Sequence, residues 1–128
     1  MITGSINSAI EGILRLTVRG PQGQRRRVSA VIDTGYNGAL TLPSDVITEL
    51  GLRWVDTVSV VLGDGRTSDC DIYAGFVVWD RRRIRIVVDE ANTTPLMGMG
   101  LLEGFELNMN VERRGRVTIK PLRRGRGR

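Results

Sequence analysis

Short stretches of alternating apolar and polar residues, separated by turn-forming residues, run through most of this 128-residue chain. The alternation is clearest at residues 13–18 and 84–88, and it is partial at residues 58–61. A period of two residues indicates a β-strand with one buried face, and many short strands with frequent turns are typical of a β-sandwich or barrel. We therefore predict an all-β fold whose hairpin connections lie at residues 21–23, 62–66 and 80–83.

Helical signals are confined to two short segments. Residues 43–50 have Pro43 near their start, an acidic residue in the first turn and Gly51 directly after them, which predicts one short helix. A second helical turn is expected at residues 101–103. We expect Trp54 and Trp79 in the core or at its edge, because each adjoins a strand-like run. No repeat or linker divides the chain, so we predict one folded domain over residues 1–112, followed by a basic, Arg/Gly-rich C-terminal strand and tail at 113–128.

The positive charge is concentrated at the C-terminus. The chain has a formal net charge of +5, but residues 113–128 hold eight Lys or Arg residues and no acidic residue, which leaves residues 1–112 at −3. Such a tail can bind nucleic acid or an acidic surface weakly through charge attraction. The alternative interpretation is a solvated terminus without a partner.

Composition also bears on chemistry and location. The chain has no histidine, which removes the commonest general base and the commonest zinc ligand. Cys70 is the only cysteine, so an internal disulfide is excluded and a reducing cytoplasm is the expected location. The N-terminus lacks the features of a signal peptide, and no apolar run reaches the roughly 18 residues of a membrane span. We expect a soluble protein with no membrane contact.

The segment with the clearest chemical meaning is Asp33-Thr34-Gly35, which follows the apolar run at residues 30–32 and precedes the apolar residues 39–42. Alone, the triplet is weak evidence, because Asp and Gly are ordinary turn residues. A carboxylate at the end of an apolar strand can, however, be held rigidly, and two carboxylates about 3 Å apart share one proton because both cannot ionise. The triplet occurs once, so a second copy of the chain would have to supply the other carboxylate.

A second motif, Pro-Leu-Met-Gly-Met-Gly-Leu-Leu at residues 95–102, follows the triplet after a glycine-tipped hairpin. With these two motifs, residues 10–111 resemble the retroviral-type, or retropepsin-like, aspartic proteases, and in particular their small single-domain bacterial and archaeal members. The resemblance implies a closed β-barrel or sandwich with one or two short helices, which forms half of a two-fold symmetric acid protease. It also implies a homodimeric endopeptidase that cleaves peptide or protein substrates.

The resemblance assigns roles to individual residues. Asp33 of each subunit would activate a water molecule, Thr34 would interlock the two active-site loops, and Gly35 would let the backbone approach the carboxylate. No cofactor or metal is implied. The segment that supports the loop would be Leu96, Met97 and Gly98.

The hairpin at residues 58–79 would be a flap that closes over an extended peptide. The substrate-binding residues would then be Leu62, Gly63, Asp64 and Gly65 at its tip, together with Tyr36 beside the triplet. The alternative interpretation of the hairpin is an ordinary exposed turn. Tyr36 either narrows the adjacent subsite or is a packing residue whose hydroxyl stays in water.

Two further possibilities remain open on the sequence. Residues 116–122 alternate as a strand that could join an intermolecular sheet in the dimer, although the flanking arginines and Pro121 favour an exposed edge instead. The function could also differ from proteolysis: a catalytically silent peptide-binding or dimerisation module, or a small β-barrel that binds nucleic acid through Arg25 to Arg27, Arg81 to Arg83 and the tail.

Overall fold

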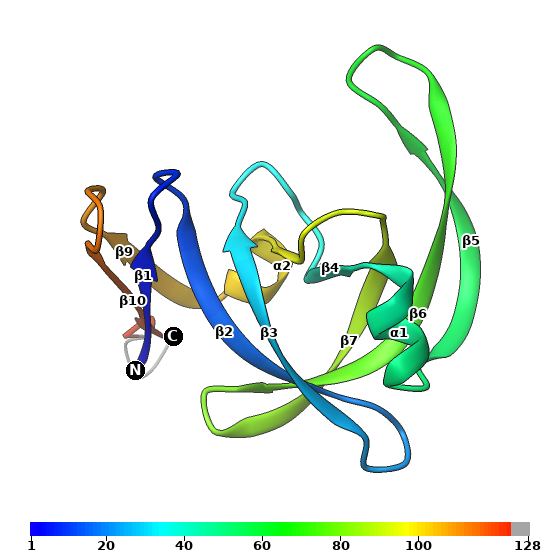
Figure 1. Cartoon of the computed structure of the whole chain (residues 1–128), viewed down its shortest axis with the longest axis horizontal. Helices are drawn as coiled ribbons and strands as arrows, with labels where there is room; N and C mark the ends of the chain where they lie inside the picture. Colours follow the sequence, from blue (N-terminus) through cyan, green and yellow to red (C-terminus); the bar gives the residue numbers. More distant parts are fainter. Residues whose placement is uncertain (124–128) are drawn as a thin grey trace, which may run out of the picture.

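A computed structural model describes residues 1–123, and strands make up most of them (Figure 1). In chain order the elements are β1 (Ile2–Ile6), β2 (Gly12–Arg19), β3 (Arg25–Ile32), β4 (Leu40–Leu42), α1 (Ser44–Glu49), β5 (Arg53–Val61), β6 (Thr67–Trp79), β7 (Arg82–Glu90), β8 (Leu96–Met97), α2 (Met99–Leu102), β9 (Phe105–Met109) and β10 (Arg116–Pro121). The prediction of an all-β chain with one or two short helices is confirmed.

All ten strands of the described residues belong to one sheet, in the order β5-β6-β7-β4-β8-β3-β2-β1-β10-β9. Strand β2 also pairs with β6, so the sheet folds back on itself instead of lying flat. Most neighbours are antiparallel hairpins, and the two parallel pairs, β3 with β8 and β4 with β7, join segments far apart in the chain. These two pairs bring the chain after β3 next to the chain after β7 and β8.

The core follows from the alternation seen in the sequence. In β2, Leu14, Leu16 and Val18 point inward and are buried, while the residues between them are more exposed. Trp79 is buried as expected, and its ring meets that of Phe105 edge-to-face at 5.5 Å. The same expectation for Trp54 is wrong, because its side chain is 58% exposed on β5 and its indole N–H donates a hydrogen bond to Asp71.

Both short helices lie close to the predicted positions. Helix α1 begins directly after Pro43, and Gly51 follows it with a φ of +61°, a left-handed conformation that glycine adopts without strain. Helix α2 begins at Met99, two residues before the predicted turn. Neither helix in residues 1–123 is long and apolar enough to cross a membrane.

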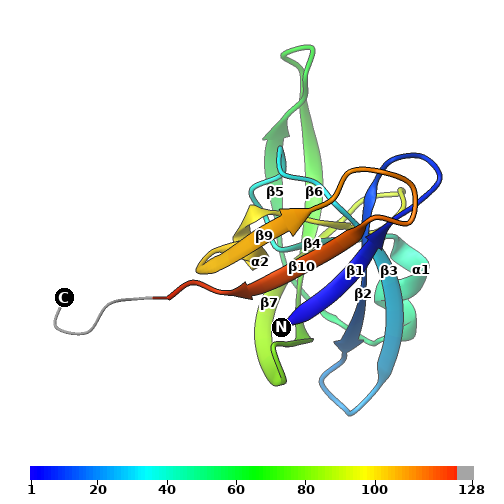
Figure 2. The same ribbon diagram turned by 90° about the vertical axis from the view of Figure 1, so that its left-hand side faces the viewer.

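Strand β10 lies between β1 and β9 and forms antiparallel pairs with both (Figure 2). Its side chains Val117 and Ile119 are fully buried in the core. The expected strand at residues 116–122 therefore exists, but both of its edges are used within the chain. This corrects the expectation of an intermolecular strand or an exposed edge there. The end of the basic tail, residues 124–128, lies outside the described residues.

We expect Ile119→Ala to lower the free energy of unfolding by about 2–5 kcal/mol, because it leaves a cavity in a fully buried site. Lys120→Ala is the matched control on the same strand: its side chain is exposed and forms only a 3.7 Å surface ion pair with Glu106, so the loss should stay below about 1 kcal/mol. Urea unfolding followed by tryptophan fluorescence measures both changes. Equal losses would contradict the placement of β10 in the core.

Candidate functional site

Asp33 comes directly after the last residue of β3, at the start of a loop that runs to Ala39. Its backbone N–H donates a 2.9 Å hydrogen bond to the carbonyl oxygen of Met97, and the N–H of Gly35 donates to the Asp33 Oδ1 atom at 3.0 Å. The backbone carbonyl of Asp33 accepts a hydrogen bond from the N–H of Tyr36. The side chain of Asp33 is half-buried, while Thr34 and Gly35 are exposed. The carboxylate is thus fixed at both its backbone and its side chain, yet reachable from solvent.

The residues after β8 hold this loop from the other side. The backbone N–H of Gly98 donates to Ala39, that of Met99 to Tyr36 and that of Gly100 to Gly38, at 3.1, 2.7 and 3.1 Å. A Cβ atom at position 98 would overlap the carbonyl oxygens of Gly38 and Tyr36, so only glycine fits there. Leu96 and Met97 form β8, which lies between β3 and β4. The structure thus brings Leu96, Met97 and Gly98 together with the Asp33 loop.

Tyr36 connects the Asp33 loop to β7. Its hydroxyl donates a 2.5 Å hydrogen bond to the Oδ2 atom of Asp89 on β7, and its ring lies against Gly38 and Gly98. Burial raises the pKa of Tyr36 well above its usual range, and the bond to Asp89 adds to the effect. The interpretation of Tyr36 as a packing residue whose hydroxyl stays in water is wrong in one respect, because the hydroxyl is hydrogen-bonded to Asp89. That Tyr36 narrows a subsite stays a prediction.

The predicted hairpin is formed by β5 and β6, which extend beyond the rest of the sheet on the same side as the Asp33 loop (Figure 1). Its tip, residues 62–65, is exposed, and the turn closes through the backbone N–H of Leu62, which donates to Arg66 at 2.7 Å. Arg66 forms a 2.6 Å ion pair with Asp64, and hydrogen bonds from Arg66 lower the pKa of that carboxyl. A closing role for this tip stays a prediction.

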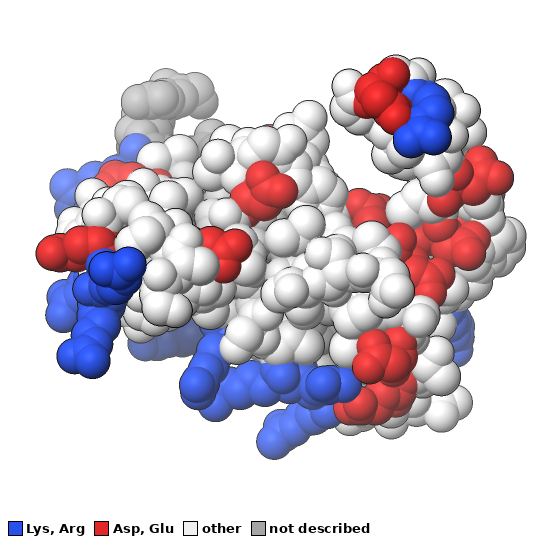
Figure 3. Space-filling view, turned by 45° about the horizontal axis from the view of Figure 1, so that its top comes forward, with Lys and Arg blue, Asp and Glu red and all other residues white. Residues whose placement is uncertain are grey.

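An acidic group at the base of the hairpin is absent from the expectations drawn from the sequence. Asp89 and Glu90 end β7, Ile72 of β6 lies directly opposite Asp89, and Asp71 and Tyr73 flank Ile72 along β6. The hydroxyl of Tyr73 donates to Glu90 at 3.3 Å, and hydrogen bonds from Thr57 and Trp54 lower the pKa of Asp71. Figure 3 shows acidic side chains gathered beneath the hairpin. The available signal was an Asp-Glu pair directly after an apolar strand.

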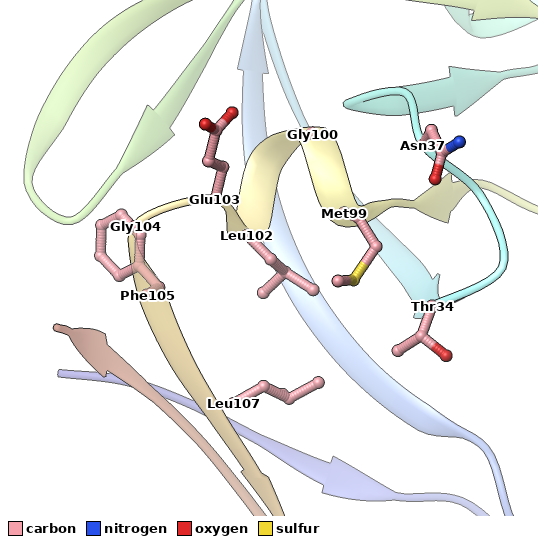
Figure 4. Close-up of a pocket in the computed structure, with 9 residues that line it drawn as sticks. All are labelled: Thr34, Asn37, Met99, Gly100, Leu102, Glu103, Gly104, Phe105 and Leu107. Atoms are coloured by element: carbon pink, nitrogen blue, oxygen red, sulfur yellow. The ribbon is translucent and has the colours of Figure 1, made fainter.

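A cavity of about 590 Å³ lies beside the loop, on the side of α2 and β9 (Figure 4). It borders Thr34 but not the carboxylate of Asp33. Its walls are mostly apolar, and the side chains that give them this character are Met99, Leu102, Phe105 and Leu107. Met99 is 46% exposed, so this apolar wall is open to solvent in the isolated chain.

The site could support acid-base chemistry, but one chain supplies only one of the two acidic groups that the chemistry requires. Each chain offers one fixed, accessible carboxylate, and in residues 1–123 no group of three or more His, Cys, Asp or Glu side chains is arranged to hold a metal ion. A single carboxylate can accept a proton from water, but a second acid is required to polarise a carbonyl group at the same time. The open apolar wall beside Thr34 is where a second chain could approach.

Comparison with other proteins gives similarity in structure only. Neither protein-family models nor curated proteins match the sequence. The structure superposes on the EIAV protease solved with the inhibitor HBY-793, with a TM-score of 0.58 and 12% identity over 73% of this chain and 86% of that one. It also superposes on a retropepsin-like aspartic protease from Rickettsia conorii, with a TM-score of 0.53 and 16% identity over 95% and 91% of the two chains.

Both neighbours are proteases, the second a retropepsin-like aspartic protease, and the superpositions cover most of each chain. At 12–16% identity such a likeness defines the fold and leaves the activity to be tested. The resemblance drawn from the two sequence motifs is therefore confirmed at the level of the fold: this chain has the fold of the retropepsin-like aspartic proteases.

Proposed function

We propose that two copies of the chain form an aspartic endopeptidase with one Asp33 from each copy at the two-fold axis. The observation that carries the proposal is the Asp33 loop itself: its carboxylate is accessible, held by the N–H of Gly35, and fixed beneath Gly98 within a retropepsin-like fold. Two such carboxylates at close range hold one proton between them.

In this proposal a water molecule lies between the two carboxylates. The ionised Asp33 removes a proton from the water, whose oxygen attacks the carbonyl carbon of the peptide bond, while the protonated Asp33 donates its proton to the carbonyl oxygen. The resulting diol collapses when the leaving nitrogen takes a proton from the carboxyl that accepted one from the water, while a diol hydroxyl returns its proton to the other carboxylate. Proton transfers therefore balance within the pair, and no covalent enzyme intermediate forms.

The wall beside Thr34 supports the dimer. Met99 and Leu107 expose apolar surface next to a loop that is incomplete without a second carboxylate, and covering such surface stabilises an association. The β5–β6 hairpin supports the binding of an extended peptide, because it rises on the same side as the loop (Figure 1). Tyr36 supports a rigid site, because it ties the loop to β7 at the base of that hairpin.

We expect wild-type protein to cleave members of a mixed peptide library between about pH 4 and 7, the range in which a proton-sharing pair acts. Asp33→Asn should reduce cleavage by at least about 10²-fold, because the general base is lost. Mass spectrometry of the products measures both. If wild type is as inactive as Asp33→Asn while sedimentation shows a dimer, the chain is a peptide-binding module and the proposed activity is wrong.

We expect Met99→Glu to shift the chain from dimer to monomer and to abolish cleavage with it, because the new charge would be buried at the interface. Val111→Glu is the matched control: Val111 is an exposed apolar residue, 63% accessible, in the turn between β9 and β10, and it does not line the cavity beside Thr34. Sedimentation velocity and activity per chain are measured on the same samples. A dimer that persists in Met99→Glu would place the interface elsewhere.

We expect Tyr36→Phe to lower the free energy of unfolding at neutral pH by about 1 kcal/mol, because Asp89 loses its hydrogen-bond donor. The wild type should lose stability as the pH rises above about 10, since tyrosine ionises there in the unfolded chain while folded Tyr36 keeps its proton. The difference between the two proteins should therefore narrow at alkaline pH. Urea unfolding from about pH 7 to 11 tests this, with Tyr73→Phe as the control that keeps most of the wild-type slope.

A further inference from the structure

The outer face of the sheet where β3, β2, β6 and β7 lie side by side carries a set of arginines that the proposed function does not use. Arg25 lies directly opposite Arg19, Arg19 opposite Phe76 and Phe76 opposite Arg85, so these four side chains form one row across four strands. Directly opposite residues point to the same face of a sheet. We name this surface the basic face; its arginines are Arg19, Arg25, Arg27, Arg53, Arg83 and Arg85.

The arginines of the basic face are not neutralised within the described residues. The ion pairs in residues 1–123 involve Arg26, Arg66 and Lys120, and none involves an arginine of this face. The contrast with Arg26 is direct, because it points to the other side of β3 and pairs with Glu49 at 2.7 Å. Arg25 and Arg19 are like charges in directly opposite positions, an arrangement that disfavours folding unless an anion lies on it.

Arg19 adds a second observation that points to a ligand. Its Nε atom is buried and has no hydrogen-bond partner within the described chain. Buried polar atoms of folded proteins are nearly always paired, with protein, water or a ligand. An N–H donor left over in the middle of a row of guanidinium groups is suited to an anionic oxygen.

The basic face also contains a cavity of about 310 Å³ with an aromatic wall. Phe76 and Pro21 line it together with Arg53, Arg83 and Arg85, and the guanidinium carbon of Arg83 lies 4.5 Å from the centre of the Phe76 ring. An aromatic ring beside several guanidinium groups is the combination that stacks a base while it holds the adjoining phosphates. A lipid surface or an acidic peptide would use the charge but not the ring.

We propose that the basic face binds a single strand of nucleic acid, with its phosphates on the arginines and a base beside Phe76. The arginines favour phosphate, because the planar guanidinium fork donates two parallel hydrogen bonds to it. The face does not compete with the Asp33 loop: the β2–β3 and β6–β7 turns lie at the end of the molecule opposite that loop (Figure 1), and Lys and Arg side chains line the edge away from the hairpin tip (Figure 3). The two sites could be occupied together.

Fluorescence anisotropy with labelled oligouridine and oligothymidine of about 12 nucleotides tests the proposal. The full chain should bind both strands at about 50 mM salt and lose affinity steeply toward about 200 mM. A triple variant, Arg25→Gln with Arg27→Gln and Arg85→Gln, should weaken binding at least about tenfold and reduce the salt slope by about 2, because three phosphate contacts are lost. Phe76→Leu should weaken binding to single strands more than binding to a duplex of the same sequence.

The matched control is Arg113→Gln with Arg114→Gln and Arg116→Gln, which removes the same charge from exposed positions at the start of β10 and just before it. It should keep binding within about threefold of wild type, since none of the three lies on the basic face. Asp33→Asn should bind as wild type does, so failure of the protease proposal leaves this one testable. Melting temperatures confirm that every variant is folded.

Three results would overturn the proposal. Equal loss in the two triple variants would mean that binding follows net charge and not this face. Absence of binding by wild type at low salt would remove the site altogether. Tighter binding to polyglutamate or to phosphatidylserine vesicles than to the oligonucleotides would assign the face to an acidic protein or to a membrane surface instead.

Discussion

The close approach of two chain segments at Gly98 is the constraint on which the candidate site depends. Four backbone hydrogen bonds join residues 97–100 to the loop between Asp33 and Ala39, and the loop carbonyls come so near that position 98 has no room for a side chain. Backbone hydrogen bonds fix a loop more firmly than side-chain contacts do, since no rotamer change can break them. The carboxylate of Asp33 is therefore positioned by the sheet and not by its own loop alone.

The loop between Asp33 and Ala39 is also connected to β7, the strand that pairs with the β5–β6 hairpin. Tyr36 reaches from the loop to Asp89, and Asp89 lies opposite Ile72 on β6, a strand of the β5–β6 hairpin. A movement at the base of the hairpin is consequently transmitted to the loop. It passes through the hydrogen bond between Tyr36 and Asp89 and through the Tyr36 ring, which packs on Gly38 and Gly98. Since rigid elements place reactive groups more precisely than free loops, this connection favours a site whose geometry is set before a substrate arrives.

Local signals in the sequence were enough to predict the strands and helices, but not which of them pair or pack together. The alternation at residues 13–18 and 84–88, the glycine-tipped turn at 62–66 and the helix after Pro43 were all predicted, because each depends on residues near one another in the chain. The position of β10 between β1 and β9, the exposure of Trp54 and the bond from Tyr36 to Asp89 depend on segments distant in sequence. The two motifs placed Asp33 and Gly98 in one site only through a resemblance to known proteins.

The distribution of charge shows most clearly that the sequence does not reveal which distant residues come together. Counted along the chain, residues 1–112 are slightly acidic and the basic character belongs to the C-terminus. In space, strand alternation sends Arg25 and Arg27 to one face and Arg26 to the other, where Glu49 neutralises it. Several acidic residues of this region gather beneath the β5–β6 hairpin, and a row of arginines lies along the edge away from the hairpin tip (Figure 3). A segment with little net charge thus presents two strongly charged surfaces, and only the register of its strands reveals them.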